Sequence, residues 1–219
     1  EGSGFAGFAR AIGAVRNNFT KDERLHTASV ADSAMWEQGV EAVIDIANDE
    51  LVMPIKERSN IEYLTLFEVF GLTTQNIDQH KEMASRWAQS SVTPHSTYSL
   101  QDNIFRSAVE ANNSTLSVHF LESAEELELY HNEGSLHQWY NKMGWECDFI
   151  HYGSPAERLV GQVARDKKLL LVHCCCLKED DLAKILSHFV VPPTFVVCPQ
   201  SNNYISGLRP PVELLLKHN

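Results

Sequence analysis

The sequence predicts an α/β protein in which parallel strands alternate with helices. Six short apolar and β-branched runs are separated by segments with helical periodicity, and such runs are typical of parallel strands covered on both faces. Polar side chains follow four of these runs at their carboxyl ends. A (β/α)₈ barrel brings such positions together at one mouth, whereas an open doubly wound sheet spreads them along an edge, so we favour the barrel. The strands are expected over residues 39–46, 63–69, 91–95, 116–120, 169–174 and 194–198.

Helical patterns occupy the segments around these strands. Residues 3–38 are mostly helical in pattern, with Phe5, Phe8 and Ile12 as a candidate inner face. Further helices are expected over residues 77–87, from Ser99, from Ser123, from Ser154 and over residues 182–189.

Two of these helices carry start signals. Ser154 is followed by Pro155, which places an N-cap serine before a proline at the first helical position. Ser123 is followed three residues later by Glu126, which matches a capping box. The helix from Ser99 is expected to bury one face, formed by Ile104, Phe105, Ala108 and Val109.

Composition and charge exclude several classes of partner. The 219 residues are 43% hydrophobic, and 18 basic against 29 acidic side chains give a formal net charge of −11. This balance leaves no basic stripe for phosphates, so we expect no nucleic-acid partner. No apolar run approaches the ~18 residues that cross a bilayer, so we expect no membrane segment. Five cysteines without a secretion signal indicate a reducing, cytoplasmic location.

His119 and Glu122 form the first candidate for chemistry. His119 ends a strand and Glu122 follows three residues later on the turn, so both side chains can reach the mouth. A histidine and a carboxylate at this spacing suit a metal-held water with a proton acceptor beside it. The alternative is a buried histidine and a glutamate that stabilises the start of the next helix. The spacing by itself leaves both interpretations open.

His173 and His95 end two further strands. His173 alone is compatible with a core histidine, but two histidines at neighbouring strand ends favour a site, because each buried imidazole needs polar partners. His95 either contacts substrate or holds the turn after its strand. Glu68 ends the second strand and is compatible with a site role or a helix cap. Asn202, after the last strand, is interpreted as part of the loop geometry only.

Four segments occur in this order along the chain: Thr93-Pro94-His95-Ser96-Thr97-Tyr98-Ser99, His119-Phe120-Leu121-Glu122, Leu171-Val172-His173-Cys174 and Val197-Cys198-Pro199-Gln200-Ser201-Asn202. Together they resemble the amidohydrolase superfamily, in particular its branch of chlorohydrolases, adenosylhomocysteine deaminases and guanine deaminases. A further stretch, residues 207–212, is similar to the segment that follows them in that branch.

The resemblance implies a role for each matched residue. His119 corresponds to a direct metal ligand on the family's fifth strand. Glu122 corresponds to the glutamate that moves protons between the attacking water and the leaving nitrogen, and His173 to the histidine that hydrogen-bonds that water or the substrate. His95 corresponds to a substrate-facing histidine. The implied activity is hydrolysis of a non-peptide C–N bond in a small heterocycle, as in a deaminase or chlorohydrolase, with one divalent ion, zinc or iron.

The resemblance also implies an incomplete barrel. The chain contains no His-x-His pair, which the family carries on its first strand, and it ends before the strand that carries the family's last aspartate ligand. Residues 1–219 are therefore expected to form a single partial barrel domain with strands two to seven of eight, without the terminal β-sandwich. We expect this piece to be inactive by itself and to form homo-oligomers through exposed strand edges. Two alternatives are a non-catalytic binding fragment and a metal-free lyase or isomerase that uses His173 and Glu122 as acid and base.

Overall fold

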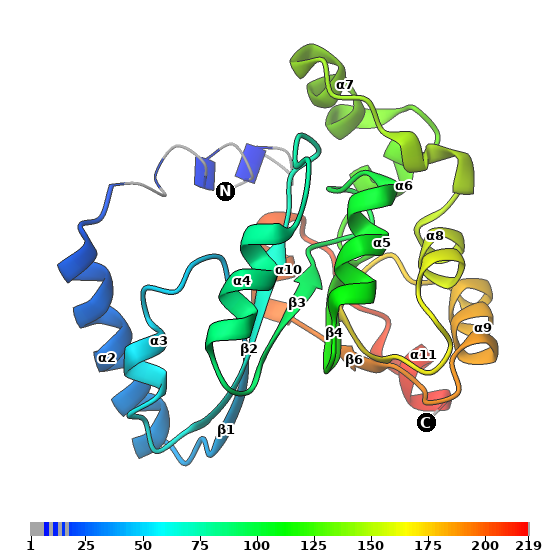
Figure 1. Ribbon diagram of the computed structural model, residues 1–219. Helices are drawn as coiled ribbons and strands as arrows, with labels where there is room; N and C mark the ends of the chain where they lie inside the picture. Colours follow the sequence, from blue (N-terminus) through cyan, green and yellow to red (C-terminus); the bar gives the residue numbers. More distant parts are fainter. Residues whose placement is uncertain (1–6, 9–10, 13–14, 16–17, 219) are drawn as a thin grey trace.

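Two three-stranded parallel sheets with flanking helices make up the fold (Figure 1). The computed structural model describes residues 7–8, 11–12, 15 and 18–218. The first sheet has the order β1-β2-β3 and the second β4-β5-β6, and every paired strand is parallel. The strands span Ala42–Ala47, Glu62–Val69, Ser90–Pro94, Thr115–Phe120, Lys168–His173 and Thr194–Val196. The predicted alternation of parallel strands and helices is confirmed; the first strand starts later and the last ends earlier than expected.

Thr93 joins the two sheets. Its Oγ1 accepts a hydrogen bond from the backbone N–H of Ser117 at 2.9 Å and donates to the Ser117 carbonyl at 2.8 Å. Further toward the carboxyl ends of the two strands, the backbone N–H of His119 donates to the His95 carbonyl at 2.8 Å. This bond belongs to an isolated parallel bridge between Ser96 and His119. β3 and β4 are therefore neighbours, and the carboxyl ends of all six strands lie on the same side.

The array is not closed into a barrel in the described part of the chain. β1 and β6 each pair with another strand on one side only. Side chains near these edges are exposed: Ile44 is 45% exposed, Ile46 37% and Val197 39%. The two open edges agree with the expected partial barrel.

Helices cover the strands in the order that the sequence pattern predicts. In Figure 1, α2 and α3 lie beside β1, whereas α8 and α9 lie on the opposite flank. The helices span Lys21–Glu37 (α2), Met53–Lys56 (α3), Asp78–Arg86 (α4), Asp102–Ala111 (α5), Ala124–Tyr130 (α6), Gly134–Met143 (α7), Pro155–Gln162 (α8), Glu179–His188 (α9), Pro199–Ile205 (α10) and Val212–Lys217 (α11), with a 3₁₀ turn η1 at Asp148–Tyr152. None of the helices among the described residues is long and apolar enough to cross a membrane.

The predicted helix starts have different outcomes. Ser154 caps α8, because its Oγ accepts from the backbone N–H of Glu157 at 3.2 Å. The capping box at Ser123 is wrong: the Ser123 side chain makes no cap hydrogen bond, and Glu126 accepts instead from the backbone N–H of Glu122. At the N-terminus, Phe5 lies outside the described residues. Ile12 was expected on a buried face, but it is 46% exposed.

The main core lies between the sheets and helices α5, α8 and α9. The four predicted inner residues of α5, Ile104, Phe105, Ala108 and Val109, are all buried. A second apolar cluster, made mainly by α6, α7 and η1, packs around Tyr98, which lies in the loop between β3 and α5. This second cluster therefore supports a loop at the carboxyl ends of the strands.

Candidate active site

Three histidines converge at the carboxyl ends of β3, β4 and β5. The ring centres of His95 and His119 are 4.7 Å apart, and those of His119 and His173 are 5.0 Å apart. The Nε2 atom of His173 lies 3.0 Å from Nδ1 of His119. The structure thus brings together the three histidines that the sequence singled out.

Glu122 lies between His173 and Tyr98. Its Oε1 atom is 3.4 Å from Nε2 of His173, and its Oε2 atom accepts a hydrogen bond from the Tyr98 hydroxyl at 3.0 Å. Both Glu122 and Tyr98 are buried. One carboxylate oxygen is therefore held by the loop after β3, while the other faces the histidines.

Glu68, at the end of β2, flanks His119 on the other side. Its Oε1 atom lies 3.6 Å from Nε2 of His119, and its Oε2 atom accepts from the Asn48 amide at 3.2 Å. Of the two roles that the sequence left open, the structure places this side chain in the cluster, because α4 starts after Ile77 without a side-chain cap.

Burial and the two glutamates set the charge of the cluster. Burial alone would raise the pKa of Glu68, but its contact with His119 lowers that pKa below its usual range. Burial would likewise lower the pKa of His119, yet Glu68 and Glu122 together raise it. Burial lowers the pKa of His95 to about 4, which keeps its ring neutral. The two glutamates thus counteract the effect of burial on the pKa of His119.

Asn202, in the middle of α10, contacts the ring of His173. Its Nδ2 atom lies 2.9 Å from Nδ1 of His173, and the side chain is buried. The interpretation of Asn202 as loop geometry only is therefore wrong. One sequence signal could have identified Asn202 as a site residue. It follows β6, just as the three histidines lie at the ends of their own strands.

Glu126 is a buried carboxyl that the sequence analysis treated only as a helix cap. It accepts from the Thr97 hydroxyl at 2.5 Å and from the backbone N–H of Glu122 at 2.9 Å. Burial, partly offset by these hydrogen bonds, raises the pKa of Glu126 to about 7. Glu126 therefore holds the backbone of Glu122 in place.

Arg158 anchors the loop that carries Tyr98, and no sequence signal identified it. Its fully buried guanidinium donates to the carbonyls of Thr97 at 2.9 Å and Leu100 at 2.8 Å. The group also lies 4.1 Å from the ring centre of Phe149 and 4.8 Å from that of Phe105. The loop is thus held by a charged group with little freedom to move.

The turns after β4 and β5 hold strained backbone. Leu121, His173 and Cys174 have φ values of 49°, 78° and 55°, and left-handed conformations of non-glycine residues cost of order 1–3 kcal/mol each. Backbone hydrogen bonds from Cys174 to Phe120 and from Cys176 to Leu121, both 2.9 Å, tie the two turns together. Strain of this kind clusters at functional sites, because a site needs side-chain directions that relaxed turns do not provide.

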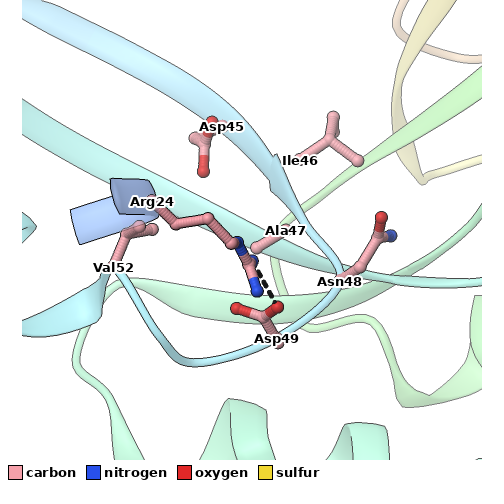
Figure 2. A pocket seen from close by; sticks show the side chains of 7 residues that line it. All are labelled: Arg24, Asp45, Ile46, Ala47, Asn48, Asp49 and Val52. Carbon is pink, nitrogen blue, oxygen red and sulfur yellow. Dashed lines mark hydrogen bonds and ion pairs between the residues drawn. The ribbon is translucent and has the colours of Figure 1, made fainter. Parts of the chain in front are cut away.

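A cavity of about 420 Å³ opens at the end of β1 (Figure 2). The guanidinium of Arg24 pairs with Asp49 across it at 2.6 Å. Asn48 lines the cavity and also donates to Glu68, so the cavity adjoins the His119 side of the cluster. The lining residues are Arg24, Asp45, Ile46, Ala47, Asn48, Asp49 and Val52.

The donor set of the cluster fits a divalent metal ion. Two groups of three residues, Glu68, His95 and His119, and His119, Glu122 and His173, have ligand atoms within 4.8 Å of one another. Imidazole nitrogens and carboxylate oxygens are the usual ligands of zinc and non-haem iron. His119 belongs to both groups, and the two glutamates beside it supply the negative charge that a cation requires.

Fold and cluster together define an α/β protein of parallel strands and flanking helices, with a histidine–glutamate centre at the carboxyl ends of its strands. The chain is 25% identical over 190 residues to the adenosine deaminase of Helicobacter pylori (strain ATCC 700392 / 26695). This match covers 81% of this chain and 46% of that protein. No family model matches.

Solved structures of an H. pylori enzyme share the fold. The crystal structure of H. pylori aminofutalosine deaminase with methylthio-coformycin matches with a TM-score of 0.84 at 22% identity, over 98% of this chain and 55% of that chain. A second crystal structure of that deaminase matches with a TM-score of 0.80 at 24% identity and the same coverage. The chain therefore spans about half the length of the proteins it matches. The comparisons thus show a similarity to deaminases, as the resemblance of the sequence motifs implies.

Proposed function

We propose that this chain is the central part of a metal-dependent deaminase that hydrolyses a C–N bond of a small heterocycle, with its six strands as strands two to seven of eight. The observation that carries the proposal is the convergence of His119, Glu122 and His173, whose ligand atoms lie within 4.8 Å of one another. The similarity to adenosine and aminofutalosine deaminases supports a nucleoside-like substrate.

Each residue has a role in this proposal. His119 holds the divalent ion, zinc or iron, whose contribution when bound is to make water a nucleophile near neutral pH. Glu122 takes a proton at Oε1 and returns it to the leaving nitrogen, since Oε2 is held by Tyr98. His173 hydrogen-bonds the attacking water or the substrate. His95, with a neutral ring, contacts the heterocycle.

Ammonia release tests the proposal directly. The longest natural form of the protein, loaded with zinc, is expected to release ammonia from at least one of adenosine, adenosylhomocysteine and guanine. A coupled assay for ammonia measures the rate. Release from none of the three, with zinc or with iron, would contradict the deaminase proposal.

A metal-free lyase or isomerase is the second candidate, and one observation favours it. His173 Nε2 lies 3.4 Å from Glu122 Oε1, which is an acid–base pair that needs no ion. Metal dependence separates the two functions, because turnover that persists after complete removal of metal supports only the second.

Metal content of the purified 219-residue chain is expected to be low and readily removed by a chelator. A catalytic zinc site usually has about three protein ligands, and in the proposed roles only His119 is a direct ligand. Elemental analysis before and after dialysis against EDTA measures the occupancy. Replacing His119 by alanine should abolish the remaining binding, whereas the same change at His26, exposed on α2, should not. One zinc per chain that survives EDTA would show that further residues of this chain are ligands.

The Tyr98→Phe variant is expected to lower kcat about tenfold or more with little change in KM. A hydrogen bond to a charged group contributes ~1.5–3 kcal/mol, and this one holds the carboxylate of Glu122 in place. Tyr63→Phe is the matched control, because its hydroxyl donates to Asp32 at 2.8 Å, away from the cluster. Equal kcat values for the two variants would show that the Tyr98 hydroxyl does not position Glu122.

A further inference from the structure

Asn202 is held rigidly against His173. The Asn202 backbone N–H donates to the Cys198 carbonyl at 3.0 Å, and its own carbonyl accepts from Ser206 and Gly207. Its side chain is 1% exposed. The amide therefore has little freedom to turn away from the imidazole, 2.9 Å away.

The contact between the two side chains has a defined polarity. An amide nitrogen is only a donor, so Asn202 Nδ2 donates and the lone pair of His173 Nδ1 accepts. A neutral imidazole carries one N–H, and in this arrangement it lies at Nε2. That N–H points toward His119 Nδ1 at 3.0 Å and Glu122 Oε1 at 3.4 Å, both of which can accept.

The same polarity continues through the cluster to Glu68. When His173 donates from Nε2, His119 accepts at Nδ1 and carries its own hydrogen at Nε2. The Nε2 atom of His119 faces Glu68 Oε1 at 3.6 Å, and a carboxylate only accepts. The opposite orientation of the Asn202 amide would reverse every donor and acceptor in this series of hydrogen bonds. A lone pair of His119 would then face the carboxylate of Glu68.

We propose that Asn202 is a positioning residue that holds His173 as the Nε2–H tautomer, so that His173 offers a proton donor to the site rather than a metal ligand. This inference rests on the proposed function for its catalytic meaning, though not for its geometry. The inference accounts for the Oδ1 atom of Asn202, which is buried without a hydrogen-bond partner among the described residues. The hydrogen bond from Nδ2 to His173 fixes the orientation of the amide and leaves Oδ1 unpaired.

Long-range ¹H–¹⁵N NMR of the purified chain, labelled at histidine and asparagine, tests the proposal without any turnover. The spectrum is recorded without metal at about pH 8, above the usual histidine pKa. We expect a protonated Nε2 and an unprotonated Nδ1 for His173, with a coupling across the hydrogen bond to the Asn202 amide. In Asn202→Asp the carboxylate can only accept, so the ring should change to mainly Nδ1–H. The matched control is Asn203→Asp, which adds the same charge at the exposed neighbouring position and should leave the tautomer unchanged.

The outcomes separate this inference from the deaminase proposal. A wild-type His173 protonated at Nδ1, or an Asn202→Asp spectrum like that of wild type, overturns the inference and leaves the deaminase proposal intact. Absence of ammonia release overturns the deaminase proposal and leaves the tautomer assignment intact. If Asn202→Asp does not fold, the wild-type tautomer and the coupling to Asn202 decide the matter.

Discussion

Replacing Glu122 by glutamine is expected to lower turnover ~10²–10⁴-fold in the longest natural form of the protein, because loss of a positioned acid–base group has effects of this size. Metal content should not change, since Glu122 transfers protons in the proposed mechanism and is not a ligand. Glutamine keeps the shape of the side chain and its place beside Tyr98 and His173. Ammonia release measures the rate, and elemental analysis measures the metal.

The control for this experiment is Glu128→Gln. Glu128 is an exposed glutamate on α6 and is not part of the cluster, so the same change in charge should leave the rate unaffected. A Glu122→Gln variant with near-normal turnover would rule out the proton-transfer role. A variant that loses both its metal and its activity would assign Glu122 to the metal instead.

Replacing Arg158 by methionine is expected to lower the free energy of unfolding by ~3–5 kcal/mol, the usual effect of removing one partner from a buried charged pair. The change removes two hydrogen bonds to the loop between β3 and α5 and the ion pair with Asp102 at 3.0 Å. Urea denaturation measures the effect. Arg106→Met, at an exposed position on α5, should change the same quantity by less than about 0.5 kcal/mol.

The loss in Arg158→Met should also depend on pH. Burial raises the pKa of Asp102 and Arg158 opposes that rise, so removing Arg158 raises this pKa further. When the pKa of a carboxyl group is higher in the folded than in the unfolded state, the group destabilises the folded state at any pH above its unfolded-state pKa. At lower pH the group is protonated in both states and has no such effect. The destabilisation should therefore be smaller at acid pH than at neutral pH. A loss below about 1 kcal/mol at neutral pH would show that Arg158 does not anchor the loop.

The sequence by itself determined the order of elements, the three histidines of the cluster and Glu122 as candidate site residues. Apolar runs and helical periodicity are local properties, and they located all six strands within a few residues. His95, His119 and His173 were identifiable because the carboxyl ends of parallel strands lie on one side of the array. Parallel strands alone would spread them along one edge, and they meet because the strands are arranged as in part of a barrel.

Only the tertiary structure decided which other polar residues join them. Asn202 resembles any loop asparagine and Glu126 any helix cap, because the partners that define their roles are remote in sequence. Asn202 bonds a ring 29 residues away, Tyr98 a carboxylate 24 residues away and Arg158 a carbonyl 61 residues away. Burial turns these contacts into constraints, since a buried polar group must find a partner wherever the fold brings one. For Glu126 and Arg158 no local pattern in the sequence contains that information.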